Sequence, residues 1–246
     1  MKRLHKRLAI FGIGCTFALV ATAHDSVQEY QEKLERCSAI PSSMMDFSPF
    51  EACRSLLQNG YGDADVHFYM GRILYLNANV DRALEHFRTA AASGSAKAVT
   101  ALAYHRGLTS TSEQQAPLDP QMVALFERAV EMGDPVAAVL LANELGINGS
   151  LRGERDLEKE QMLLEGASEQ GFAPAHFFLA LFYRSPKTAN PGPEVSIDLL
   201  EQAAQGGVRR AAEALAAEGH DISAYGDLDS MRYQYIGSSD LVLRRP

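Results

Sequence analysis

The sequence repeats itself at a nearly constant interval, and this repetition limits the folds that the chain can adopt. Alanine stands four residues before and four residues after each of four glycines, and leucine stands eight residues after. Phenylalanine or leucine stands seven residues before each glycine. The intervals are 39, 38 and 36 residues, and the glycines are Gly94, Gly133, Gly171 and Gly207. Such a period indicates one small structural unit that is used several times.

The spacing within each unit predicts two antiparallel helices. Residues at −7 and −4 from the glycine share one face of a helix, and residues at +4 and +8 share one face of the next. Glycine favours the left-handed backbone that ends many helices. Alanine on both sides of the turn lets the two helices approach closely. We therefore expect an all-α fold, a right-handed α-solenoid of stacked antiparallel helix pairs.

The same pattern predicts where the helices lie. Asp81 and Asp119 are expected N-caps, and Pro120 follows Asp119 at a first helical position, which proline favours. The expected pairs cover 65–76 with 81–93, 96–106 with 119–132, 135–145 with 155–170, and 173–184 with 194–205, followed by a last helix at 209–218. Loops of variable length are expected inside the repeats at 107–118, 146–153 and 185–193. Stacked repeats tolerate such insertions.

The first 23 residues have the pattern of a signal peptide. A basic start is followed by an apolar run from Leu8 to Ala23, which ends in the small-x-small sequence at 21–23. The run is 16 residues long, shorter than the ~20 that span a bilayer, although an uncleaved anchor is the alternative. Cys15 lacks the leucine three residues earlier that a lipidation site would have. We therefore expect a soluble protein in the periplasm, or secreted, after cleavage near Ala23.

The charge of the remaining chain excludes one class of partner. The signal segment carries four of the 23 basic residues and no acid, which leaves 19 basic residues against 31 acidic ones. Nucleic acid and anionic lipid are bound by clustered Lys and Arg, and a body this acidic repels both. We expect no nucleic-acid partner, and no membrane span after cleavage.

Two cysteines remain after cleavage, Cys37 and Cys53. An even number in an oxidising compartment favours a disulfide, and two unpaired buried thiols are the alternative. Short helices at 26–37 and 49–58 would be joined by this bridge. The chain then divides into a signal peptide at 1–23, a capping helical hairpin at 24–63, about four repeats plus a terminal helix at 64–219, and a non-repeat tail at 220–246.

The repeat resembles a known family. The pattern Ala-x-x-x-Gly-x-x-x-Ala-x-x-x-Leu, at a period of 36–39 residues, is similar to that of the Sel-like repeat proteins, which are relatives of the tetratricopeptide repeats. The segment 164–175 is the most similar, and the resemblance covers about 64–215. The family commonly has glycine directly after the +8 leucine. This chain has alanine there, at Ala103, Ala142, Ala180 and Ala216.

The resemblance implies a scaffold or regulator that binds other proteins of the cell envelope. Exported members are implicated in control of sensor kinases, in exopolysaccharide or flagellar assemblies, and in contact with host factors. A cysteine-rich branch with a disulfide in each repeat is associated with penicillin binding and β-lactam hydrolysis. Here the cysteines precede the repeats, so this reading is not supported.

The sequence carries no known catalytic motif. There is no His-x-x-x-His pair, no Cys-x-x-Cys, no Gly-x-Ser-x-Gly, no Ser-x-x-Lys and no Walker loop after the signal segment. We expect no metal, no cofactor and no catalysis by this chain. A cell-envelope hydrolase of β-lactam or peptidoglycan, with an unrecognised site, is the alternative. A degenerate first repeat precedes the four others and is counted from Gly62. His67 and His176 share position +5, and are either groove residues or partly buried helix residues.

We expect the partner, a protein or a peptide, to bind on the inner wall that the first helices of the pairs form. Positions +6 and +10 lie away from the face that carries the +4 alanine and +8 leucine. Two of these residues, Tyr104 and Phe177, are expected to be exposed anchors, because aromatic side chains dominate interface energetics. The full candidate set is Phe68, Arg72, Thr100, Tyr104, Asn143, Phe177 and Leu181.

Overall fold

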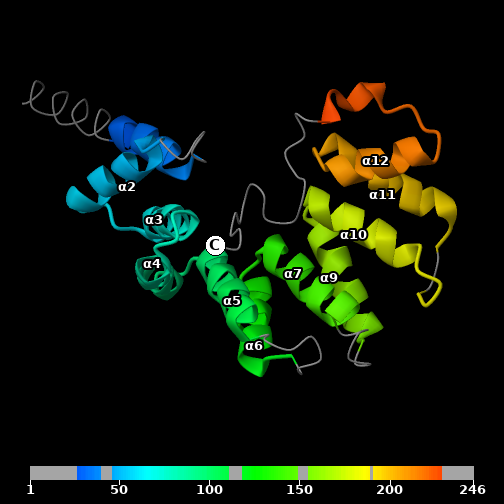
Figure 1. The fold of residues 1–246 in the computed structure, drawn as a ribbon, viewed down its shortest axis with the longest axis horizontal. Helices are drawn as coiled ribbons and strands as arrows, with labels where there is room; N and C mark the ends of the chain where they lie inside the picture. The colour runs from blue at the N-terminus through cyan, green and yellow to red at the C-terminus, as the bar shows by residue number, and fades with distance from the viewer. Residues whose placement is uncertain (1–26, 40–45, 111–117, 149–154, 189–190, 229–246) are drawn as a thin grey trace, which may run out of the picture. The chain divides into compact units, whose positions relative to one another are not determined.

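The computed structural model describes residues 27–39, 46–110, 118–148, 155–188 and 191–228, and these residues contain helices and no strand. The expected signal peptide and most of the expected tail lie outside the described residues. The chain forms two compact units, Met1–Gly62 and Asp63–Pro246. Figure 1 shows the helices along the chain.

The described part of the first unit contains two helices and a disulfide. The described part of its first helix covers residues 27–38, and α2 is Ser48–Gln58. Cys37 and Cys53 are bonded to each other, which agrees with the expected pairing, and both are fully buried. The rings of Tyr30 and Tyr61 lie 5.2 Å apart, so aromatic packing adds to the covalent link.

The second unit is a succession of helix pairs. Each helix packs on the next along the chain, and the first helices α5, α7 and α10 also pack on one another in order. The expected fold class, stacked antiparallel helix pairs, is confirmed. The elements are α3 (Ala64–Leu76), α4 (Val80–Ala92), α5 (Ala96–Ser110), α6 (Pro120–Glu131), α7 (Pro135–Asn143), the π-helical turn η1 (Glu144–Asn148), α9 (Leu157–Glu169), α10 (Ala173–Tyr183), α11 (Pro193–Gln205), α12 (Arg209–Ala217) and the 3-10 turn η2 (Ser223–Tyr225).

The repeat glycines end the helices as the pattern predicts. All four have positive φ, at 91°, 86°, 74° and 88° in chain order. In each turn the carbonyl of the −4 alanine accepts a hydrogen bond from the N–H of the residue after the glycine, for example Ser95 to Ala90 at 3.0 Å and Asp134 to Ala129 at 3.0 Å. This is the Schellman pattern, and it gives the −4 alanine a backbone role beside its packing role.

The helix starts are capped mainly by aspartate. Asp119 accepts a hydrogen bond from the N–H of Gln121 at 2.9 Å, as expected. The prediction for Asp81 is wrong, because α4 begins one residue earlier, at Val80, and Asn79 is the N-cap. Asp81 lies in the first turn, where its carboxylate complements the helix dipole.

Two helix ends also differ from the prediction. Helix α5 continues to Ser110, past the expected end at Arg106, and α7 passes into the π-helical turn η1 instead of ending at Leu145.

Candidate partner-binding surface

Position +6 of the first helices is buried, and the expectation of a surface there is wrong. Phe68, Thr100 and Phe177 are only 1%, 0% and 7% exposed, and Val139 at the same position is 0% exposed. A first helix in a stack has neighbours on two sides, its own pair partner and the helices of adjacent repeats, so its buried arc is wide. The aromatic ring of Phe68, for example, packs 5.9 Å from that of Phe87 on α4.

The buried Thr100 has a structural partner in the next repeat. Its hydroxyl donates to Oδ2 of Asp134, the N-cap residue of α7, and also lies 3.1 Å from the carbonyl of Ala96. The other carboxylate oxygen of Asp134 accepts the N–H of Val136 at 3.1 Å. Thr100 therefore joins two repeats and is not available to a ligand.

Position +10 differs among the helices. Arg72 is 4% exposed, with its guanidinium 5.0 Å from the ring centre of Tyr69, so it is also wrongly assigned to the surface. Tyr104 and Asn143 are half-buried, and Leu181 is 43% exposed. These last three residues stand at the same place on α5, α7 and α10, which pack in succession. We call Tyr104, Asn143 and Leu181 the first-helix row, and it is the candidate surface.

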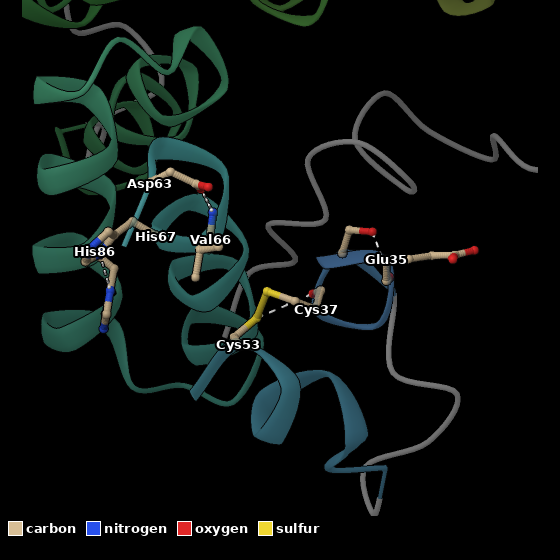
Figure 2. Close-up of a disulfide and its surroundings, with 8 residues drawn as sticks. Glu35, Cys37, Cys53, Asp63, Val66, His67 and His86 are labelled. Carbon is tan, nitrogen blue, oxygen red and sulfur yellow. Dashed lines mark hydrogen bonds between the residues drawn. A yellow bond between two sulfur atoms is a disulfide. The ribbon is translucent and has the colours of Figure 1, made fainter. Parts of the chain in front are cut away.

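The histidines of the helix pairs lie at contacts between helices. Burial is the largest cause that lowers the pKa of four of them, so each is held toward its neutral form. The two histidines at position +5, His67 and His176, are among them. Both correspond to the second alternative given above, that of partly buried helix residues. The contacts are His67 Nδ1 to His86 Nδ1 at 2.9 Å (Figure 2), Tyr75 Oη to His105 Nδ1 at 3.1 Å, and Ser168 Oγ to His176 Nδ1 at 2.7 Å.

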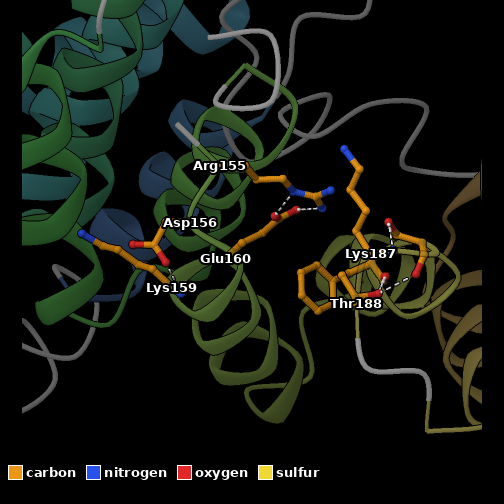
Figure 3. A network of polar contacts seen from close by, with 8 residues as sticks. Arg155, Asp156, Lys159, Glu160, Lys187 and Thr188 are labelled. Atoms are coloured by element: carbon orange, nitrogen blue, oxygen red, sulfur yellow. Dashed lines mark hydrogen bonds and ion pairs between the residues drawn. The ribbon is translucent and has the colours of Figure 1, made fainter. Parts of the chain in front are cut away.

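An ion pair between the half-buried Arg155 and the buried Glu160 lies against η1, the turn that follows α7. Glu160 is 7% exposed, and its carboxylate accepts two hydrogen bonds from Arg155, at 2.8 and 3.1 Å (Figure 3). A Cβ on Gly146 would stand 2.2 Å from Oε1 of Glu160, so only glycine leaves room for this carboxylate. The guanidinium of Arg155 also lies 6.0 Å from the ring centre of Phe182. Sequence reasoning missed this cluster, although a glycine within an apolar helical segment is a usable sign of close approach.

In the residues that the structure describes, no group of three or more His, Cys, Asp or Glu is placed to hold a metal ion. None of the helices there is long and apolar enough to cross a bilayer.

Comparison with known proteins gives structural neighbours only. No protein-family model matches the chain, and no curated protein matches it at a significant level. A Sel1 repeat protein from Oxalobacter formigenes is 20% identical, with a TM-score of 0.56 over 76% of this chain and 73% of that one. A protective antigen of uropathogenic Escherichia coli strains that displays an SLR fold is 21% identical, with a TM-score of 0.51. That match covers 70% of this chain and 36% of the antigen. Together with the repeat geometry, these similarities show that the chain has the Sel1-like repeat fold.

Proposed function

We propose that this protein is a protein–protein interaction scaffold or adaptor of the bacterial cell envelope, with no catalysis of its own. The observation that carries the proposal is the first-helix row. It brings one aromatic, one amide and one apolar side chain from three consecutive first helices to partly or well exposed positions. The three side chains follow one another at the interval of one repeat. A row with this spacing suits an extended peptide or a helix of another protein.

The neighbouring polar groups support a binding role over a catalytic one. Thr100 on α5 is paired with Asp134 at the start of α7, and Arg155, just before α9, is paired with Glu160 in the first turn of that helix. Buried groups that are satisfied in this way stabilise the array, whereas catalysis needs groups aimed at a substrate. Binding energy would then come from exposed side chains such as Leu181.

Site-specific photocrosslinking in the native host tests the scaffold. A photoreactive amino acid at position 181 or 104 should capture a discrete partner. The matched control is position 162, because Met162 is 62% exposed but lies on α9, the second helix of its pair. Equal capture at 162 and 181 would contradict the assignment of the first-helix row, and no capture at any of these positions would contradict the scaffold.

A hydrolase is the second candidate, because Ser168 and His176 form a close pair. The Ser168 hydroxyl lies 2.7 Å from Nδ1 of His176, and burial lowers the pKa of that imidazole, which keeps it in the form of a base. A fluorophosphonate probe separates the two proposals. Labelling that disappears in Ser168→Ala would establish a reactive serine, whereas an unlabelled protein supports a structural bond between α9 and α10.

We also propose export with cleavage after Ala23. The proposal rests on the basic start, the apolar run and the small-x-small sequence of residues 1–23. Mass spectrometry of the protein from the periplasmic fraction should give an N-terminus at His24. An intact Met1, or a lipid on Cys15, would contradict it.

A further inference from the structure

Two histidines of the first repeat face each other across its helix pair. His67 on α3 and His86 on α4 are both half-buried, with their Nδ1 atoms 2.9 Å apart and their ring centres 5.1 Å apart. The rings therefore meet nearly end to end, as the close-up in Figure 2 shows. Such a contact is a hydrogen bond only when one Nδ1 carries the proton and the other is bare.

The contact lies beside the aromatic core of the repeat. The next residue on each helix is a phenylalanine, and Phe68 and Phe87 pack with ring centres 5.9 Å apart while being 1% and 0% exposed. The ring of Phe87 also lies over Gly71, where an added Cβ would stand 2.7 Å from it. The helices thus approach closely at this level, and a change in the histidine contact acts directly on the packed rings.

Three charged groups act on the pair. Asp63, which caps α3 by accepting the N–H of Val66 at 2.9 Å, raises the pKa of His67. On α4, Arg82 lowers the pKa of His86 and Glu85 raises it. Burial outweighs these effects and lowers the pKa of both imidazoles, and His67 further lowers that of His86.

We propose that the His67–His86 contact is a proton-operated latch, which opens the α3–α4 pair when both rings become charged and so uncovers Phe68 and Phe87. The first added proton goes to Nε2 of the donating ring and leaves the bond intact. The second goes to the bare Nδ1 of the accepting ring, where it places two N–H donors and two positive charges face to face. Opening therefore requires two protons.

The direction of the effect follows from the lowered pKa values. The unfolded or opened state binds protons more readily than the closed state, so the closed state loses stability as the pH falls below the ordinary imidazole value of about 6.5. Each proton taken up on opening multiplies the opening constant by up to ~10 per pH unit. Two protons give a limit of ~100 per pH unit, which distinguishes the latch from a single titrating histidine.

Hydrogen exchange of the full chain between pH 7.5 and 5.0, in EDTA and corrected for the intrinsic exchange rate, tests the latch. The opening constant of α3 and α4 should rise by more than ~100-fold in total, with a slope above that of one proton. Helices α6 and α7 have no histidine and serve as the internal control, in which the opening constant should stay unchanged. Binding of a hydrophobic dye should increase over the same pH range.

Two variants keep the test specific. His86→Gln can still hydrogen-bond to His67 but takes up no proton, so the acid response of α3–α4 should fall to ~10-fold per pH unit or less. His220→Gln changes an exposed histidine and should leave the response as in the parent. Equal protection of α3–α4 at both pH values, or an undiminished response in His86→Gln, would overturn the latch. If that variant does not fold, NMR titration of the parent decides. Two ring signals that both titrate at about 6.5 would also overturn it.

Discussion

Thr100 and Asp134 are joined by a buried hydrogen bond that links the first helices of two consecutive repeats. The threonine stands six residues after one repeat glycine, and the aspartate stands one residue after the next. Asp134 uses its other oxygen to cap α7. A single carboxylate therefore caps one first helix and is hydrogen-bonded to α5, the first helix of the preceding repeat.

Replacing Thr100 with valine should therefore destabilise the array. Valine keeps the shape of threonine but removes the donor, and the buried carboxylate loses one of its bonds. We expect a loss of about 1.5–3 kcal/mol in the free energy of unfolding, measured with urea. Thr89→Val is the matched control, since Thr89 is exposed and bonds only to the carbonyl of Glu85 in its own helix. A loss no larger than that of Thr89→Val would show that the link between repeats is not made.

Two glycines should respond to alanine in opposite directions. Gly133 has φ of 86° with open space around a would-be Cβ, so Gly133→Ala should cost about 1 kcal/mol through backbone strain alone. Gly166 lies inside α9, also with open space, and Gly166→Ala should stabilise by roughly 0.5–1 kcal/mol. Urea unfolding of both variants measures the two changes in stability. Changes of the same sign would show that the helix does not end in a left-handed turn at Gly133.

Alanine variants of Phe177 and Leu181 should distinguish a core position from a surface position on the same helix, α10. Phe177 is 7% exposed, and Phe177→Ala should cost about 3–5 kcal/mol. Leu181 is 43% exposed, and Leu181→Ala should change stability by less than about 0.5 kcal/mol while weakening partner capture. Thermal melts and crosslinking of the two variants give the comparison. A strongly destabilised Leu181→Ala would remove this residue from the candidate surface.

Reduction of the disulfide should loosen the first unit. Closing a loop of this length is worth about 3 kcal/mol on the chain-entropy model, and the described part of this unit buries little other apolar surface. Proteolysis should therefore cut residues 46–62 faster after reduction, while α9–α12 are cut at an unchanged rate. Two free thiols in the unreduced, denatured protein would show that the bond is absent.

Periodicity was sufficient to predict the helix pairs because the same four positions recur around every turn. It also carried a cap that sequence reasoning overlooked. The residue directly after the glycine caps a first helix at Asp63 and Asp134, and Ser95 accepts the N–H of Ala98 at 3.3 Å in the same way. The glycine turn fixes the position of this capping residue, so the repeat spacing was sufficient to predict the cap.

The candidate surface could be predicted only in part. Helical geometry, at ~100° per residue, places +6 nearly opposite +4 and therefore away from the face that carries the +4 alanine. It contains no information about the next repeat, whose first helix covers that side and buries Thr100 and Val139. Position +10 lies ~40° further round, at the edge of this contact, so its exposure depends on the local neighbours and varies from Arg72 to Leu181.

Position +6 is exposed on α12, the last α-helix among the residues that the structure describes. In α12 this position holds Glu213, which is exposed and paired with Arg209 at 2.8 Å, whereas earlier helices hold phenylalanine, threonine or valine there. A stack of repeats ends in half of an interface, and an apolar half would accept the start of another molecule and build a filament. A charged residue at that place would oppose such growth, because a new contact would have to bury its carboxylate.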